Sequence, residues 1–274
     1  MLLSVSSKAI YEMEPEIQNL DDEFVNKSSG WILRKLEVCG YLKESMRIVI
    51  TGGPSSEPID QVRAITNRST GELAVKLARR VAASGHSVEL FLGQGAIFRS
   101  ETAKYFWTNE DLYRLLSDVV ERHHIHAVFH AAALSDFGVA KLDIRGGHPG
   151  AAKISSDAES IQLRLVPKPK LILRLRELFT NAYIVGWKFE LDGTLEDVVR
   201  EGIQQIRLNR TNACVINGAA FGPGFGFCTE NGLVHTTETR DALTDWLVEM
   251  LDRNALAGDG GERDAVPRDP AAQV

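Results

Sequence analysis

The sequence has little cysteine, no long apolar run and no excess of basic residues, and each shortage excludes a class of protein. Its three cysteines, Cys39, Cys214 and Cys228, are odd in number and widely spaced, so they predict neither a disulfide framework nor a zinc site and suit a reducing compartment. No continuous apolar stretch marks a secretion signal or a transmembrane helix. The formal net charge of -6 argues against a nucleic acid or an anionic membrane as the main partner. We therefore expect a cytoplasmic protein.

Two common nucleotide-binding signatures are also missing. The first Gly-rich loop, TGGPSSEPID, has neither the Gly-Lys-Ser/Thr of a Walker A loop nor the GxGxxG of a dinucleotide-binding loop. The second expected strand does not end in the acidic residue that holds a ribose. These absences count against an NAD-dependent oxidoreductase.

The chain is organised as one main domain with two flanking segments. Hydrophobic residues make up 44% and charged residues 25% of the 274 residues, which suits a globular protein with a sizeable core. Residues 46–252 are expected to form that domain. Residues 1–45 carry scattered apolar positions that permit helical pieces, and we treat them as a peripheral extension. Residues 253–274, rich in Gly, Ala, Asp and Pro, are expected to be a disordered tail.

Short apolar strands alternate with amphipathic helices from Arg47 onward. This alternation predicts an α/β fold with a doubly wound, mainly parallel, Rossmann-like sheet, whose ligands bind at the carboxyl ends of the strands. A β-hairpin is expected at 225–237, and the polar interval 138–158 is expected to be a long lid or disordered loop. The expected strands cover 47–51, 87–92, 125–133, 160–166, 182–187 and 213–216, and the expected helices cover about 69–85, 109–122, 168–178, 194–208 and 239–251.

The loop after the first strand is the first candidate site. Gly52 and Gly53 could let backbone N–H groups approach phosphate oxygens, and a helix beginning near Ser69 would add its positive dipole end, although ordinary turn chemistry explains the loop equally well. Arg63 and Asn67 stand four residues apart, so on a helical turn they would share a face, or they are simply two solvated polar residues.

Three later segments offer further candidates. HAAALSDF (130–137) places small residues and Asp136 at a strand end, which suits either a ligand or a tight strand–helix contact with an Asp cap. Lys153 lies in the 138–158 interval, where a lysine could neutralise phosphate charge or remain solvated. Trp187 could stack on a base or belong to the core, and Asn217 could bind or only shape a turn.

Two other features are not expected to be sites. The run GPGFGF (222–227) is expected to be a flexible connection into the hairpin. Four histidines straddle a helix end and a strand, so their side chains should diverge, and we do not expect a metal site at His123, His124, His126 and His130.

Six segments together resemble the phosphopantothenate-cysteine ligase (phosphopantothenoylcysteine synthetase) family, over about residues 46–252. The order of the motifs along the chain matches that of the family, which makes the set specific. The motifs are ITGGPSSEPIDQVRAITNRSTG (50–71), HAAALSDF (130–137), AAKISS (151–156), LVPKPKLI (165–172), VGWKFELD (185–192) and ACVING (213–218).

The resemblance implies an enzyme of coenzyme A biosynthesis that activates 4'-phosphopantothenate with a nucleoside triphosphate and Mg²⁺ and then joins it to cysteine. It implies that Asn67 holds the acyl carboxylate region, that Lys153 acts on the first transfer and that Arg63 reaches the substrate of a neighbouring subunit in a homodimer. It assigns nucleotide binding to Gly52, Gly53, Ser69, Gly71, Ala131, Ala132, Asp136, Lys153, Trp187 and Asn217. The magnesium ligands stay unassigned.

The chain also departs from the family pattern. Gly218 stands where an Asp often follows the Asn, Ala74 stands where a Gly is common, and QQIRLNR (204–210) lacks two lysines four apart, for which Arg207 or Arg210 could substitute. The EPIDQVR segment favours CTP, whereas Lys188 resembles the members that use ATP. A degenerate nucleotide-binding protein without ligase activity would show the same departures and is the main alternative.

Overall fold

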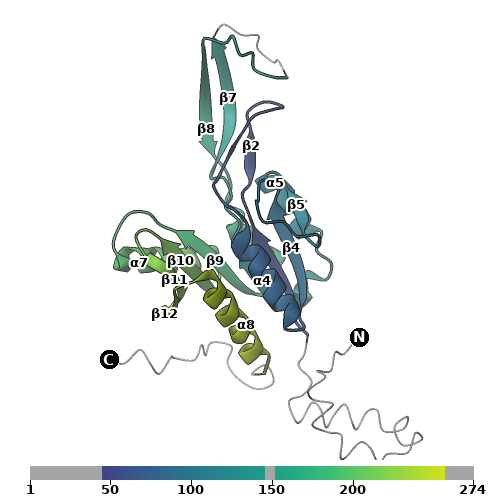
Figure 1. Cartoon of the computed structure of the whole chain (residues 1–274), viewed down its shortest axis with the longest axis vertical. Coiled ribbons are helices and arrows are strands. Elements are labelled where there is room, and N and C mark those ends of the chain that lie inside the picture. Colours follow the sequence, from purple (N-terminus) through teal and green to yellow (C-terminus); the bar gives the residue numbers. More distant parts are fainter. Residues whose placement is uncertain (1–44, 146–151, 257–274) are drawn as a thin grey trace, which may run out of the picture.

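One eight-stranded sheet organises the chain, and the computed structural model describes residues 45–145 and 152–256 (Figure 1). The strand order is β12-β11-β10-β9-β6-β1-β4-β5. The strands from β10 to β5 in this order run parallel, and β11 pairs antiparallel with both β10 and β12. The predicted doubly wound, mainly parallel sheet is confirmed.

The elements follow the chain in alternation. The strands of the sheet are β1 (Arg47–Gly52), β4 (Ser87–Gly93), β5 (Lys104–Phe106), β6 (Ala127–His130), β9 (Tyr183–Phe189), β10 (Ala213–Gly218), β11 (Gly222–Thr229) and β12 (Gly232–Thr237). Two hairpins outside it are built from β2 (Ser56–Pro58), β3 (Ala64–Thr66), β7 (Phe137–Arg145) and β8 (Ser160–Pro167). The α-helices are α4 (Glu72–Ala83), α5 (Asn109–Ser117), α6 (Ile172–Leu178), α7 (Leu195–Asn209) and α8 (Arg240–Leu256).

The sheet is buried on both faces because successive side chains of its strands point to opposite sides. In β1, Ile48 and Ile50 join the core cluster that includes α4 and α8, whereas Val49 joins the cluster that includes α5 and α6. Helix α7 packs over β10 and β11 through a third cluster. Figure 1 shows α4 and α8 side by side along one face.

Several predicted helix boundaries are wrong. Helix α4 has Gly71 at its N-cap, with no side-chain cap from Ser69. Helix α5 ends at Ser117 with Asp118 as its C-cap, and the last residue of the predicted helix begins a separate 3₁₀ turn after the left-handed Glu121. Helix α6 begins at Ile172, since prolines at 167 and 169 disfavour the helical conformation for the residues before them. Helix α8 runs to Leu256, so the disordered tail predicted from residue 253 is wrong for residues 253–256. The rest of that tail and residues 1–44 lie outside the described residues.

The interval 138–158 differs most from expectation. Residues 137–145 form strand β7, which pairs antiparallel with β8 from Phe137↔Pro167 to Arg145↔Ser160. The loop prediction for 138–145 is therefore wrong, and so is the placement of 160–166 in the main sheet. The reason is that the two strands satisfy their hydrogen bonds with each other and leave most of their side chains exposed. We call this two-stranded sheet the arm. Figure 1 shows it standing away from the main sheet, with β2 near its base.

The C-terminal hairpin is confirmed, with its turn at Glu230 and Asn231 between β11 and β12. The flexible connection predicted for residues 222–227 is wrong, because these residues begin β11. Gly226 pairs there with Ile216 of β10 and with Thr236 of β12.

Candidate functional site

The chain reverses its winding direction between β1 and β6, which is where ligands bind in doubly wound sheets. Backbone hydrogen bonds continue past the ends of these two strands: Ala131 N donates to Thr51 O at 3.0 Å and Ala133 N donates to Gly53 O at 2.9 Å. Ser55 N returns a bond to Ala133 O at 3.1 Å. The first two sequence motifs therefore meet at one edge, with Gly52, Gly53, Ala131 and Ala132 within it.

Asn67 ties these two motifs together. Its Nδ2 donates to the carbonyl oxygens of Ala133 at 3.2 Å and Leu134 at 3.0 Å, so both amide protons have acceptors in the HAAAL segment. The predicted helical turn shared with Arg63 is wrong, because Ala64–Thr66 is strand β3 between the two residues. A strand extends the chain far more than a helical turn and carries the two side chains to different neighbours.

The glycines at this edge allow close packing. A Cβ on Gly52 would lie 2.2 Å from the Cβ of Ala74, so α4 can approach β1 only where residue 52 lacks a side chain. This explains why Ala74 is accommodated where the family often has Gly. Gly53 and Gly71 both have positive φ and both face the methyl group of Ala96. This packing does not test their predicted role in phosphate binding, which stays a prediction.

Ser69 and Asp136 flank the same edge. Ser69 is half-buried, and its N–H donates to Asn67 O at 3.1 Å. The Asp136 carboxylate is 65% exposed and lies 3.9 Å from Nζ of Lys170. The carbonyl oxygen of Asp136 accepts a hydrogen bond from Lys168 N at 2.8 Å, which closes the base of the arm.

Trp187 and Asn217 lie at the ends of β9 and β10. The half-buried ring of Trp187 packs against the core and meets the Phe129 ring edge to face, with centroids 6.5 Å apart. Its Nε1 is buried and finds no hydrogen-bond partner within the described residues. Asn217 lines a cleft of about 620 Å³ together with the charged side chains of Lys76 and Arg240.

Gly218, one of the departures from the family, is required by the backbone. Its φ is +119°, and a Cβ there would lie 2.1 Å from the carbonyl oxygen of Glu190. The Asp that often occupies this position in the family could not be accommodated without a shift of the chain.

Arg63 and the segment that carries Lys153 meet away from the strand ends, where the β2–β3 hairpin contacts the residues that lead into β8. Asp60 connects them: its carboxylate accepts the N–H groups of Ile154 at 3.0 Å and of Val62 and Arg63 at 2.7 Å. The Ile154 N–H, followed by the other two and the Arg63 guanidinium at 2.6 Å, holds the pKa of Asp60 far below its usual range despite burial.

Arg63 also donates to Ile154 O at 3.2 Å, so within this chain it fixes the segment that carries the exposed Lys153. Sequence reasoning missed Asp60, although an Asp at the start of a tight turn commonly caps the following N–H groups. It also missed Lys168, whose contacts with two glutamates involve residues far away in the sequence.

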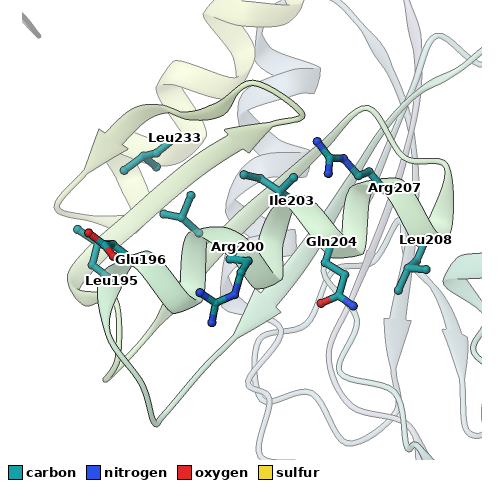
Figure 2. Close-up of a pocket in the computed structure, with 9 residues that line it drawn as sticks. Leu195, Glu196, Arg200, Ile203, Gln204, Arg207, Leu208 and Leu233 are labelled. Carbon is teal, nitrogen blue, oxygen red and sulfur yellow. The ribbon is translucent and has the colours of Figure 1, made fainter.

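Arg207 and Arg210, the two candidates to replace the missing lysines, lie in the last turn of α7 and at its C-cap. Figure 2 shows Arg207 on the outer face of α7, where it lines a groove of about 820 Å³. This groove is mainly apolar and is lined by none of the residues predicted to bind nucleotide. Arg210 is the C-cap of α7 and pairs with Glu177 at 3.6 Å.

Two absences concern the part of the chain that the structure describes. Within residues 45–145 and 152–256, no group of three or more His, Cys, Asp or Glu side chains is placed to hold a metal ion. None of the helices in that part of the chain combines the length and the apolar character that crossing a bilayer requires.

The strand order and the edge between β1 and β6 define a Rossmann-like α/β protein with a topological switch point, the place where ligands bind in such sheets. The chain belongs to the family described as the DNA/pantothenate metabolism flavoprotein C-terminal domain, whose model matches residues 43–256. This match confirms the resemblance to the phosphopantothenate-cysteine ligase family that the six motifs indicated.

Relatives agree with this assignment. The chain is 29% identical over 190 residues to the coenzyme A biosynthesis bifunctional protein CoaBC of Thermococcus kodakarensis, an alignment that covers 68% of this chain and 44% of that protein. The chain thus spans less than half of that relative. The DNA/pantothenate metabolism flavoprotein of Streptococcus pneumoniae superposes with a TM-score of 0.66 at 23% identity, over 76% of this chain and 99% of the other. A Cab2 variant in complex with phosphopantothenate-cysteine gives 0.59 at 16% identity, over 88% and 97%, and shows the same fold.

Proposed function

We propose that this protein is a phosphopantothenate-cysteine ligase, a carbon–nitrogen ligase of coenzyme A biosynthesis. The observation that carries the proposal is the hydrogen bonding of Asn67 to the carbonyls of Ala133 and Leu134, because it joins the two motifs proposed to bind the acid and the nucleotide at the switch point. The family match over residues 43–256 supports the same conclusion.

The reaction has two steps. A carboxylate oxygen of 4'-phosphopantothenate attacks the α-phosphorus of the nucleotide and displaces pyrophosphate, which gives an acyl nucleotidylate. The amine of cysteine then attacks the acyl carbon, loses a proton and displaces the nucleoside monophosphate. Asn67 is proposed to hold the carboxylate region, and Lys153 to offset negative charge that develops in the first step.

The nucleotide is proposed to lie along the carboxyl edge of the sheet. Gly52, Gly53, Ser69 and Gly71 would surround its phosphates, and the remaining contacts would come from Ala131, Ala132, Asp136, Lys153, Trp187 and Asn217. We propose CTP as the nucleotide in preference to ATP, on the basis of the EPIDQVR segment. Mg²⁺ would be coordinated mainly by the phosphates of the nucleotide and by water, and the exposed carboxylate of Asp136 is available as an oxygen ligand.

The assembly is proposed to be a homodimer in the cytoplasm, with Arg63 contacting the phosphopantothenate of the neighbouring subunit.

The function is tested by pyrophosphate release with CTP or ATP, phosphopantothenate and cysteine. Release is expected to require the nucleotide and phosphopantothenate but not cysteine, and the amide product, detected by mass, is expected to require all three. Asn67→Asp is expected to suppress release, because its carboxylate would face two carbonyl oxygens and the acid substrate. Asn231→Asp, the same change in an exposed turn, is the matched control. Folded protein that releases no pyrophosphate with either nucleotide would contradict the proposal.

A second candidate is a nucleotide-binding protein of this family without ligase activity. The positions of Arg207 in the outer groove and of Arg210 beside Glu177 favour it, since neither replaces a phosphate-binding lysine at the sheet edge. Saturable nucleotide binding without pyrophosphate release would identify it.

A further inference from the structure

Lys168 lies at the base of the arm, immediately after β8. Its N–H donates to Asp136 O at 2.8 Å, next to the first residue pair of the arm. Its side chain crosses Gly138 of β7 so closely that a Cβ on Gly138 would lie 3.1 Å from Cδ of the lysine. The lysine therefore contacts both strands where the arm leaves the main body.

The ammonium group of Lys168 joins two carboxylates from other elements. Nζ lies 2.5 Å from Glu57 Oε1 in β2 and 3.0 Å from the carboxylate of Glu110 in the first turn of α5. The Lys168 and Glu57 side chains are only 13% and 6% exposed, whereas that of Glu110 is 61% exposed. The pair with Glu57 is consequently the better shielded of the two contacts.

These contacts fix the arm relative to the β2–β3 hairpin at its base. At the other end of the hairpin, Ile154 N donates to Asp60, and Gln61 N donates to Ala152 O at 3.0 Å. The hairpin is thus connected to the base of the arm and, at its other end, to the segment 152–154 that leads into β8. The hairpin is in turn attached to the main body by the bond from Ser56 N to Trp107 O at 2.8 Å.

We propose that Lys168 is a positioning residue that sets the direction of the arm relative to the carboxyl edge of the sheet and thereby aligns Lys153 for nucleotidyl transfer. This inference rests on the proposed function. Lys168 acts through the arm and not on the reacting atoms, so its loss should lower turnover more than nucleotide affinity.

A variant that tests this role must remove the charge of Lys168 without leaving the buried Glu57 carboxylate unpaired. Burial alone would lower the pKa of Lys168, but the hydrogen bonds that its ammonium donates to Glu57 and Glu110 outweigh it and raise the pKa, so the lysine stays charged. Lys168→Met would leave the Glu57 carboxylate buried without its cation and destabilise the fold. Lys168→Met combined with Glu57→Gln removes both charges and keeps the chain volumes similar, which separates positioning from stability.

Arm orientation is measured by the distance between spin labels on Gln162→Cys in β8 and Arg79→Cys in α4, in full-length protein carrying Cys39→Ser. Both labelled positions are exposed. The protein with native Lys168 and Lys168→Arg are expected to give one narrow distance distribution, and the double variant a distribution at least about twice as broad. Pyrophosphate release by the double variant is expected to fall about 100-fold, as for a catalytic group displaced by about 1 Å, with the nucleotide KM within about threefold.

Lys141→Met is the matched control, since Lys141 is an exposed lysine of the same arm whose ion pair, with Asp143, stays within β7. It is expected to change neither the distances nor turnover. Unchanged distances in the double variant, or broadened distances with unchanged turnover, would overturn the positioning role. Absence of pyrophosphate release from the wild-type protein would instead overturn the proposed function.

Discussion

Gly218 and Gly232 offer a matched test of why glycine occupies position 218. Both have a φ of +119°, so an alanine at either position pays a similar torsional cost. Their surroundings differ: a Cβ on Gly218 would lie 2.1 Å from the carbonyl oxygen of Glu190, whereas a Cβ on Gly232 would meet nothing within 4 Å. The difference between the two alanine variants therefore isolates the steric overlap.

The expected magnitudes follow from these two contributions. The unfavourable φ should cost about 1–3 kcal/mol of unfolding free energy at each position. The overlap should add about 1–3 kcal/mol at Gly218 only, because the Glu190 carbonyl also accepts a hydrogen bond from Ala220 N at 3.2 Å and is held in place. In a domain of this size, each kcal/mol lowers Tm by about 2–4 °C.

Urea denaturation of the wild type, Gly218→Ala and Gly232→Ala, fitted with a common m-value, measures the difference. Gly218→Ala is expected to lose at least about 1 kcal/mol more than Gly232→Ala. Gly218→Asp, which introduces the common family residue, should lose at least as much as Gly218→Ala. Equal losses of unfolding free energy at the two positions would refute the steric argument. Gly218 would then again count in favour of a nucleotide-binding protein without ligase activity.

Three further predictions concern the arm, the assembly and pH. Lys153→Ala should reduce turnover about 100-fold or more while nucleotide titration shows little change, because a cation that meets developing charge acts on the transition state. Arg63→Ala and Asn67→Asp chains, each inactive alone, should recover about a quarter of wild-type activity when mixed, since half of the dimers are mixed and half of their sites are intact. Burial lowers the pKa of His130 to about 4, so this histidine takes up a proton more readily in the unfolded chain than in the folded one. Stability should therefore fall as pH drops from about 6.5 towards 4, by about 2 kcal/mol at pH 5, and this share should vanish in His130→Gln.

Each of these has a clear opposing outcome. Unchanged turnover in Lys153→Ala would remove that lysine from the mechanism. Mixed dimers, confirmed by mass, that show no recovery would place the action of Arg63 within its own subunit. Urea titrations at pH 7.5 and 5 that give the same pH-dependent loss for wild type and His130→Gln would show that the buried His130, 2.8 Å from the Thr51 hydroxyl, does not control this dependence.

Local patterns in the sequence predicted most strands of the main sheet. The β-branched run of β1 and the Asn231-Gly232 hairpin signal act within a few residues, so the sequence alone predicted these elements. Motif order likewise predicted the family, and the match over residues 43–256 confirms it.

The arm and its connections were decided by tertiary structure. Strand β8 was predicted at 160–166, but β7 carries mostly exposed side chains and lacks the apolar pattern that marks a strand of a buried sheet, so its pairing with β8 could not be predicted. The pairing of Asp60 with Ile154 and of Lys168 with Glu57 joins residues 94 and 111 positions apart, and only the folded chain brings such partners together. Gly218 shows the same dependence: its sequence neighbours allow many residues, and it is the carbonyl of Glu190, on the adjacent strand segment, that leaves room for none larger than glycine.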